Sequence, residues 1–310
     1  MREQRPLIGI SMGDPAGIGP EVTVRSLLLE EIYELCRPLV VGDLDVISEA
    51  VTFSGLSLRT RAVRDPAAGA YEHGTVDVLD LDNVDVDRLE YGKVSAAGGR
   101  ACFQYIAKVI ELAMADRLAA TTTGPIHKEA LRAADIHYPG HTEIYADLTG
   151  TQDFAMMLAD GEFRVVHVST HVALREACDL VTEERVYKVI RLGDRALRRL
   201  GIAAPRIAVC GLNPHCGEGG LFGNEEADQI APAVERAREE GLDVDGPIPP
   251  DTVFPKMKGG LYDLVVAMYH DQGHIATKLL GFTYEAESDT WLSVSGVNVT
   301  LGLPIIRTSV

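Results

Sequence analysis

Short apolar runs typical of buried strands alternate with amphipathic helical patterns along most of this 310-residue sequence. This alternation constrains the fold more than any other feature, because strands separated by helices pair in parallel and are covered by the helices. Apolar residues recur at helical spacing, opposite a charged face, in the stretches 95–116, 182–199 and 225–240. Strands are expected at 7–12, 38–41, 118–122, 164–168, 206–210 and 264–268. The sequence therefore predicts an α/β protein with a mainly parallel sheet.

The length of the chain and one atypical segment add detail to this fold class. A chain of 310 residues is too long for one simple core, so two domains or one large α/β domain are expected. The segment 281–303 shows two strand-like runs around a polar turn, which predicts an antiparallel arm or sheet edge. This arm is either a dimer contact or an ordinary surface hairpin.

Charge and cysteine content exclude several classes of function. The 29 Lys and Arg residues against 46 Asp and Glu give a formal net charge of −17, which argues against non-specific nucleic-acid binding. An anionic substrate stays possible, because a basic pocket can sit within an acidic surface. No apolar stretch approaches the roughly 20 residues that cross a bilayer, and the first residues do not form a signal peptide. The five scattered cysteines, without a CxxC pair, indicate free thiols and a cytoplasmic protein.

Three histidines follow three of the expected strands: His171, His215 and His270. Ligands of open α/β sheets bind beyond the carboxyl ends of the strands, so these imidazoles are expected to converge there. Three neutral imidazoles suit zinc or another divalent transition ion. The alternative for each histidine is a hydrogen-bonded loop residue.

Two further histidines have more ordinary explanations. His274 lies four residues after His270, but Gly273 stands between them and the glutamate of a helical protease motif is missing. His274 is therefore expected to support a metal ligand, to contact substrate, or to be a loop histidine. His167 lies inside a strand run and is expected in the core or facing the sheet.

Several segments carry groups that favour a phosphate or carboxylate. His127 and Lys128 follow a Gly-Pro turn, and His141 and Thr142 follow Gly140 at the start of helical patterns, where free backbone N–H groups attract anions. Thr142 is equally well explained as a helix N-cap. Full positive charge is available from Lys278 and Arg307. The glycine-rich GDPAGIGPE, by contrast, fits neither the dinucleotide nor the P-loop spacing and predicts a tight turn with Asp14 at its rim.

These stretches together resemble the 4-hydroxythreonine-4-phosphate dehydrogenase family of pyridoxal phosphate biosynthesis. The matching segments are GDPAGIGPE, TGPIHK, GHTE, STHVALR, CGLNPHCGEGG, GPIPPDT, AMYHDQG and GVNVTLGLPIIRTS. The resemblance implies two α/β/α domains similar to those of isocitrate and isopropylmalate dehydrogenases, an interdomain active-site cleft and a homodimer that shares the site. We expect a first domain of 1–135 with 282–310, and a second domain of 136–281 that carries the histidines.

The resemblance also implies a reaction and the residues that serve it. A divalent metal (Zn, Mn, Co, Ni or Mg) and NAD or NADP would oxidise the secondary alcohol of a four-carbon phosphorylated hydroxy acid to a β-keto acid, which decarboxylates. The general base is not identified, and Asp251, Asp271 and Lys278 are the candidates. The implied metal ligands are His171, His215 and His270, and the implied substrate-binding residues are His141, Thr142, Lys278, Asn298 and Arg307.

Two departures from the family pattern refine the expected substrate. His274 and Ile275 stand where the biosynthetic enzymes commonly have Leu-Pro, and the segment 283–295 is longer. Both features resemble the branch that oxidises 4-phospho-D-threonate or 4-phospho-D-erythronate. The sequence stops at Val310, where family members continue into a helical region beside the dinucleotide, so the first domain is expected to be incomplete.

Two alternatives to this activity stay open. One is a dehydrogenase of cis-dihydrodiol dicarboxylates of the terephthalate type, against which the anion-binding residues His141, Thr142, Lys278 and Arg307 argue. The other is a metal-binding dimer without turnover.

Overall fold

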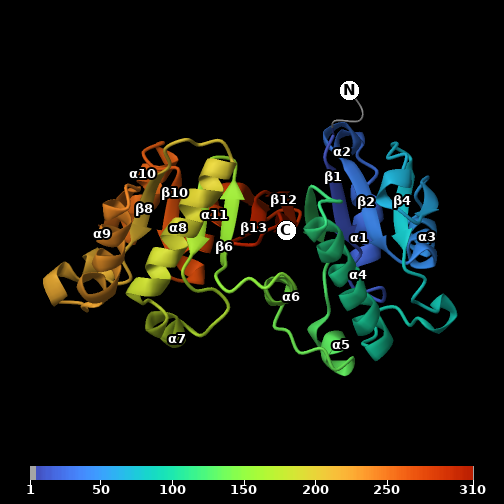
Figure 1. Ribbon diagram of the computed structural model, residues 1–310, viewed down its shortest axis with the longest axis horizontal. Coiled ribbons are helices and arrows are strands. Elements are labelled where there is room, and N and C mark those ends of the chain that lie inside the picture. Colours follow the sequence, from blue (N-terminus) through green and yellow to red (C-terminus); the bar gives the residue numbers. More distant parts are fainter. Residues whose placement is uncertain (1–4, 310) are drawn as a thin grey trace. The chain divides into compact units, whose positions relative to one another are not determined.

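The computed structural model describes residues 5–309, which form two compact units (Figure 1). The first unit comprises residues 5–152 and 303–309, and the second comprises residues 153–302. Each unit is built on a sheet with helices packed against it, so the α/β class is confirmed.

The first unit contains a wholly parallel sheet in the strand order β3-β4-β2-β1-β5-β14. Its strands are β1 (Leu7–Ser11), β2 (Arg37–Gly42), β3 (Arg59–Val63), β4 (Thr75–Asp80), β5 (Ala120–Thr123) and β14 (Arg307–Ser309). Its helices are α1 (Gly19–Ser26), α2 (Glu30–Leu35), α3 (Leu44–Phe53), α4 (Ala96–Met114), α5 (Lys128–Ala133) and α6 (His141–Leu148). The helix α4 begins where the Ser95 side chain accepts a hydrogen bond from the Gly98 backbone N–H.

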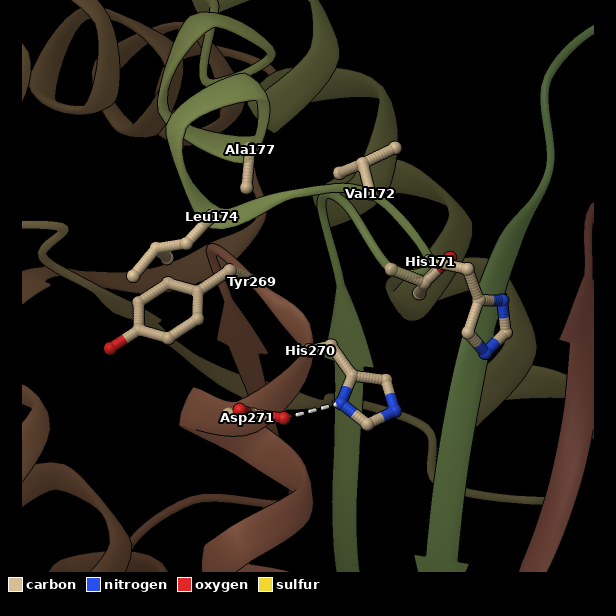
Figure 2. A pocket seen from close by; sticks show the side chains of 8 residues that line it. His171, Val172, Leu174, Ala177, Tyr269, His270 and Asp271 are labelled. Atoms are coloured by element: carbon tan, nitrogen blue, oxygen red, sulfur yellow. Dashed lines mark hydrogen bonds and ion pairs between the residues drawn. The ribbon is translucent and has the colours of Figure 1, made fainter.

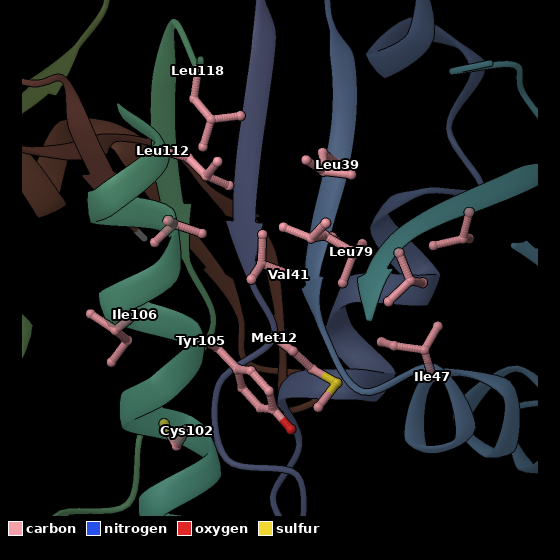
Figure 3. Close-up of a cluster of buried hydrophobic side chains, with 14 of the residues drawn as sticks. Met12, Leu39, Val41, Ile47, Leu79, Cys102, Tyr105, Ile106, Leu112 and Leu118 are labelled. Carbon is pink, nitrogen blue, oxygen red and sulfur yellow. The ribbon is translucent and has the colours of Figure 1, made fainter. Parts of the chain in front are cut away.

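One apolar core fills the first unit. Figure 3 shows Tyr105 of α4 beside Met12, and both are buried in one cluster with Ile106 of α4 and Val41 of β2. Ile106 belongs to the apolar face that the sequence predicts for this helix, so the predicted face is buried in the same core as the strands. No helix in the described part of the chain is long and apolar enough to cross a membrane.

The second unit contains a mixed sheet in the order β13-β6-β7-β10-β8-β9. Its strands are β6 (Ala155–Asp160), β7 (Phe163–His167), β8 (Arg206–Cys210), β9 (Asp243–Ile248), β10 (Leu264–Ala267) and β13 (Val297–Leu301). The strands β7, β10, β8 and β9 are parallel, whereas β6 is antiparallel to both of its neighbours. Its helices are α7 (Leu174–Asp179), α8 (Glu183–Arg199), α9 (Ala231–Glu239), α10 (Pro250–Lys258) and α11 (His270–Gly281).

The central strand β10 is buried on both faces. Val266 packs in the cluster with α8 and α9, while Val265 packs on the opposite side against α10. Every residue of β10 is therefore apolar, as expected for a central parallel strand.

All six strands expected in the alternating pattern exist, and β13 lies in the second strand-like run expected within 281–303. The strands β3, β4, β6, β9 and β14 were not predicted. The edge strand β3 has the sequence RTRAV, which carries too few apolar residues to stand out. The expected helix 225–240 divides into a wide turn at Glu226–Ile230 and then α9, because Pro232 in its first turn has no N–H to continue the hydrogen bonding.

The unit boundaries differ from the expected ones at 135/136 and 281/282. Residues 136–152 lie with the first unit, because Ile144 and Tyr145 of α6 are buried in its core. Residues 282–302 lie with the second unit, because β13 pairs with β6. The expected arm is the antiparallel hairpin of β11 (Phe282–Glu285) and β12 (Thr290–Val294).

Candidate functional site

The three strands that precede the predicted metal ligands are neighbours in the second unit. The order β7-β10-β8 is parallel throughout, so their carboxyl ends lie at the same edge of the sheet. His171 follows β7, His215 follows β8, and His270 is the first residue of α11 after β10. The strand order cannot be read from the sequence. It places the ends of the three strands that precede the histidines next to one another.

His171 and His270 line a common pocket at this edge (Figure 2). Their ring centroids are 5.6 Å apart and their planes are inclined by 47°. Two imidazoles bound to one tetrahedral zinc ion have centroids about 5 Å apart, given the usual Zn–N distances. The observed pair therefore fits two ligands of one ion.

The Asp271 carboxylate fixes the orientation of the His270 ring. Its Oδ1 atom lies 2.7 Å from Nδ1 of His270. Since a carboxylate accepts hydrogen bonds, Nδ1 carries the proton in the neutral ring and Nε2 keeps its lone pair. A carboxylate behind a histidine is the usual support of a metal-binding imidazole.

Two further imidazoles adjoin this pair. The rings of His270 and His274 are stacked, with centroids 3.7 Å apart and an angle of 11° between planes. Behind them lies His167 on β7, which is fully buried and whose Nε2 is 3.2 Å from Nδ1 of His274. Burial lowers the pKa of His167 to about 3 and that of His274 to about 4, so both rings are neutral near pH 7.

His215 lies in a loop with an unusual backbone. Residues 215–220 all have positive φ, including His215 at 53°, Cys216 at 55° and Glu218 at 44°. Such angles cost non-glycine residues roughly 1–2 kcal/mol each, so surrounding contacts must hold them. Within residues 5–309, no cluster of three or more His, Cys, Asp or Glu side chains is arranged to hold a metal ion. The structure thus brings two of the three predicted ligands together and does not add the third.

A buried carboxylate anchors the His215 loop. Glu226 is 4% exposed, and its Oε1 accepts hydrogen bonds from the backbone N–H groups of Leu212 and Asn213, both at 2.7 Å. Its Oε2 accepts another from Nδ2 of Asn213 at 3.0 Å. These bonds fix the chain immediately before the run of positive φ angles. Glu226 was not predicted as a site residue, because an acidic residue near a helix start gives no signal of burial.

The predicted anion-binding residues of the first unit gather around Arg307. This arginine on β14 is 4% exposed, donates a hydrogen bond to Oγ1 of Thr123 at 2.9 Å, and lies over the Tyr145 ring. The ring of His141 is buried nearby, and its Nε2 has no hydrogen-bond partner among the described residues. Burial, reinforced by the charge of Arg307, lowers the pKa of His141 to about 3. Thr142 is the next residue of α6. A buried polar atom without a partner is rare and points to a missing ligand.

The remaining predicted site residues lie in the second unit. Asn298 on β13 has a buried Oδ1 atom without a partner among the residues described. Lys278 is exposed on α11, two turns after His270. Of the three candidate bases, Asp271 contacts His270 and Asp251 lies in the first turn of α10. Burial is the main cause that raises the pKa of the Cys216 thiol in the His215 loop, and the charges of Glu226 and Asp251 add to it.

The glycine-rich segment after β1 is a tight turn, as predicted. Gly13 has a φ of 85°, and a Cβ atom there would lie 2.4 Å from the Pro125 carbonyl oxygen. Asp14, expected at the rim, is instead buried, where its Oδ1 accepts a hydrogen bond from the Ala16 backbone N–H at 2.9 Å. Burial is also the main cause that raises the pKa of Asp14.

Comparison with known proteins places these features in a family. The family model described as pyridoxal phosphate biosynthetic protein PdxA matches residues 34–310. A D-threonate 4-phosphate dehydrogenase of Cupriavidus necator is 46% identical over 311 residues, which span all of this chain and 90% of the relative.

Solved structures show the same likeness. A 4-hydroxythreonine-4-phosphate dehydrogenase from Burkholderia phymatum superimposes with a TM-score of 0.88 at 46% identity, covering 99% of this chain and 89% of the other. A terephthalate 1,2-cis-dihydrodiol dehydrogenase from Burkholderia xenovorans reaches a TM-score of 0.67 at 29% identity, with the same coverage of both chains.

Proposed function

Because this chain belongs to the PdxA family, we propose that it is a metal-dependent NAD(P) dehydrogenase of a four-carbon phosphorylated hydroxy acid of the 4-phospho-D-threonate type. The observation that carries this proposal is the pairing of His171 and His270 beyond two adjacent parallel strands, with Nδ1 of His270 hydrogen-bonded to the Asp271 carboxylate. The relatives are named as dehydrogenases of small phosphorylated hydroxy acids, which supports the substrate class and the dehydrogenase activity. The product is a β-keto acid that decarboxylates.

The residues of the second unit fit a divalent metal, most simply zinc. His171 and His270 supply two imidazole nitrogens, and Asp271 supports one of them. His215 completes the proposed set through a homodimer in which the two copies share the ligands, since no third ligand joins them within the described residues of one chain. When bound, the metal lowers the pKa of the substrate hydroxyl and stabilises the negative charge that decarboxylation develops.

The chain's own residues would orient the anionic substrate. Arg307 offers a buried guanidinium for bidentate binding of a phosphate or carboxylate. The unpartnered atoms of His141 and Asn298 give two further contacts that a bound ligand would satisfy. Thr142 and Lys278 complete the proposed substrate-binding set. NAD or NADP, when bound, would supply the hydride acceptor. Asp251 and Lys278 stay the candidate proton acceptors, whereas Asp271 is engaged with His270.

An exposed apolar surface supports the proposed homodimer. Ile275 and Leu279 on α11 and Trp291 and Leu292 on β12 are each more than half exposed, and Leu279 reaches 81%. Large apolar side chains left exposed on one helix and one hairpin are typical of a protein–protein interface. A partner is expected to bury them.

Reduction of NAD and of NADP in the presence of three compounds tests the proposal: 4-phospho-D-threonate, 4-phospho-D-erythronate and 4-hydroxythreonine 4-phosphate. Each assay is run with and without a chelator. Chelator-sensitive turnover of a sugar acid supports the proposed branch, whereas preference for the amino compound supports vitamin B6 biosynthesis. Binding of metal without turnover of any of the three would contradict the proposal.

The second candidate is oxidation of an aromatic cis-dihydrodiol carboxylate. The likeness to the terephthalate dihydrodiol dehydrogenase favours it, although at 29% identity against 46% for the phosphorylated-substrate enzyme. Turnover of the dihydrodiol alone, with silence on the phosphorylated acids, would establish this alternative.

A further inference from the structure

The pair formed by fully buried His167 and partly buried His274 has no assigned role in the proposed reaction. His167 stands on β7, where an apolar residue would fill the core without requiring any hydrogen bond. The chain nevertheless accommodates its ring against α11. Gly273 makes this possible, since a Cβ atom at that position would lie 2.4 Å from Nε2 of His167. The contact between the two imidazoles therefore depends on three residues from two elements.

The hydrogen bonds determine which nitrogen of each ring carries the proton. Nδ1 of His167 lies 3.2 Å from the carbonyl oxygen of Met156. A carbonyl only accepts, so this Nδ1 is the donor and Nε2 of the neutral His167 ring is an acceptor.

The same logic extends to the second ring. Nδ1 of His274 faces two acceptors, Nε2 of His167 at 3.2 Å and the carbonyl oxygen of His270 at 3.1 Å. It must therefore carry the proton, and Nε2 of the neutral His274 ring is left with a lone pair. That Nε2 atom has no hydrogen-bond partner within the described residues.

The position of His274 indicates what this lone pair faces. Residues 270, 274 and 278 are spaced by four on α11 and so lie on one face of the helix, about 6 Å apart along its axis. His274 is stacked on the proposed metal ligand His270, and the charge of Lys278, the proposed anion-binding lysine, acts on its ring. A substrate that contacts both the metal at His270 and the ammonium group of Lys278 therefore lies next to His274.

We propose that His167 fixes the tautomer of His274, so that Nε2 of His274 accepts a hydrogen bond from a substrate hydroxyl adjacent to the one that is oxidised. This proposal rests on the proposed function for the identity of the substrate. His274 is then a specificity-determining residue, which favours an acid with a hydroxyl at C2 over one without it. His167 is a positioning residue, which acts through His274.

Nitrogen NMR of the histidine side chains tests the tautomer without any turnover. In the zinc-loaded protein, we expect His274 to carry its proton on Nδ1, with its resonance assigned by its loss in His274→Leu. His167→Phe fills the same space but leaves only the carbonyl oxygen of His270 to accept from Nδ1 of His274, so it is expected to raise the population of the Nε2-protonated form of His274. Protonation of His274 on Nε2 in the unaltered protein, or no change in His167→Phe, would overturn the proposal.

Paired substrates test the contact itself. We expect His274→Leu to reduce kcat/KM for 4-phospho-D-threonate by about 10- to 100-fold, the usual cost of leaving a polar group unpaired. Its effect on 3-hydroxy-4-phosphobutanoate, which lacks the C2 hydroxyl, should be less than about twofold by the same reasoning. His274→Asn retains an acceptor oxygen and should recover part of the loss for the first substrate only. The exposed His137→Leu, in the first unit, is the matched control.

The outcomes separate the two proposals. Equal losses of kcat/KM for both substrates in His274→Leu would refute the contact while leaving the proposed function intact. An unaltered protein that oxidises neither compound would refute the proposed function together with the contact.

Discussion

Nδ1 of His270 donates a hydrogen bond to the Asp271 carboxylate, so Nε2 is the ring nitrogen of His270 that is available to bind a metal in the pocket. The two residues are consecutive in the sequence, at the first turn of α11. The first measurable consequences concern metal affinity.

Replacement of Asp271 by Ala should weaken metal binding about 10- to 100-fold, because the imidazole loses both its orientation and part of its basicity. Competition with a chromophoric chelator measures this affinity directly. Asp179→Ala removes an exposed carboxylate from the end of α7 and should leave the affinity unchanged. Equal affinities for Asp271→Ala and the unaltered protein would show that the carboxylate does not support a ligand.

Removal of the Glu226 side chain should destabilise the second unit. In Glu226→Ala the N–H groups of Leu212 and Asn213 lose their acceptor, which costs about 1–3 kcal/mol in free energy of unfolding. Urea denaturation provides the measurement, and Glu235→Ala on the exposed side of α9 is the control. A loss no larger than that of the control would mean that the His215 loop holds its conformation by other contacts.

The stability of the first unit should fall with acidification below about pH 6.5. His141 has a folded-state pKa near 3, whereas its unfolded value is 6.5, so the unfolded chain binds more protons between these values. The free energy of unfolding therefore rises with pH in that window, by at most about 1.4 kcal/mol per pH unit for this one group. In His141→Leu the slope should be shallower between pH 4 and 6.5, while exposed His137→Leu should retain the full slope.

Charge placed in the apolar surface of α11 and the hairpin should prevent dimer formation. We expect Leu279→Glu and Trp291→Lys to convert a dimer to monomers, because both side chains are more than half exposed in the single chain. Light scattering after size-exclusion chromatography measures the mass. Arg175→Glu, an exposed position on α7, is the control. A dimer that survives both substitutions would place its interface on another surface.

Much of the fold was accessible from the sequence because apolar periodicity reports burial. The strands around Val166 and Val265 were predicted for this reason, and so was the buried face of α4. Edge strands such as β3 were missed, since one exposed face removes half of that signal. The family and the fold class inferred from sequence motifs are confirmed.

The candidate site was accessible only in part. The structure places the rings of His171 and His270 5.6 Å apart, but this proximity depends on the strand order β7-β10, which is a long-range property, and their role as metal ligands stays a prediction. His167 was expected in the core, where it is, yet its hydrogen bond to His274 depends on two elements about 100 residues apart in the sequence. The convergence of His215 with the other two ligands stays a prediction.

The burial of β10 on both faces gives the three histidine positions unequal mobility. Backbone amides of a central strand exchange with solvent only when the whole unit opens, whereas loops open locally at much lower free energy. His270 is the third residue after that strand, separated from Ala267 by Met268 and Tyr269, while His171 and His215 lie in loops. We therefore expect the ring of His270 to keep its position during the local openings that move His171 and His215. A bound ion would dissociate when these loops open, while His270 stays in place.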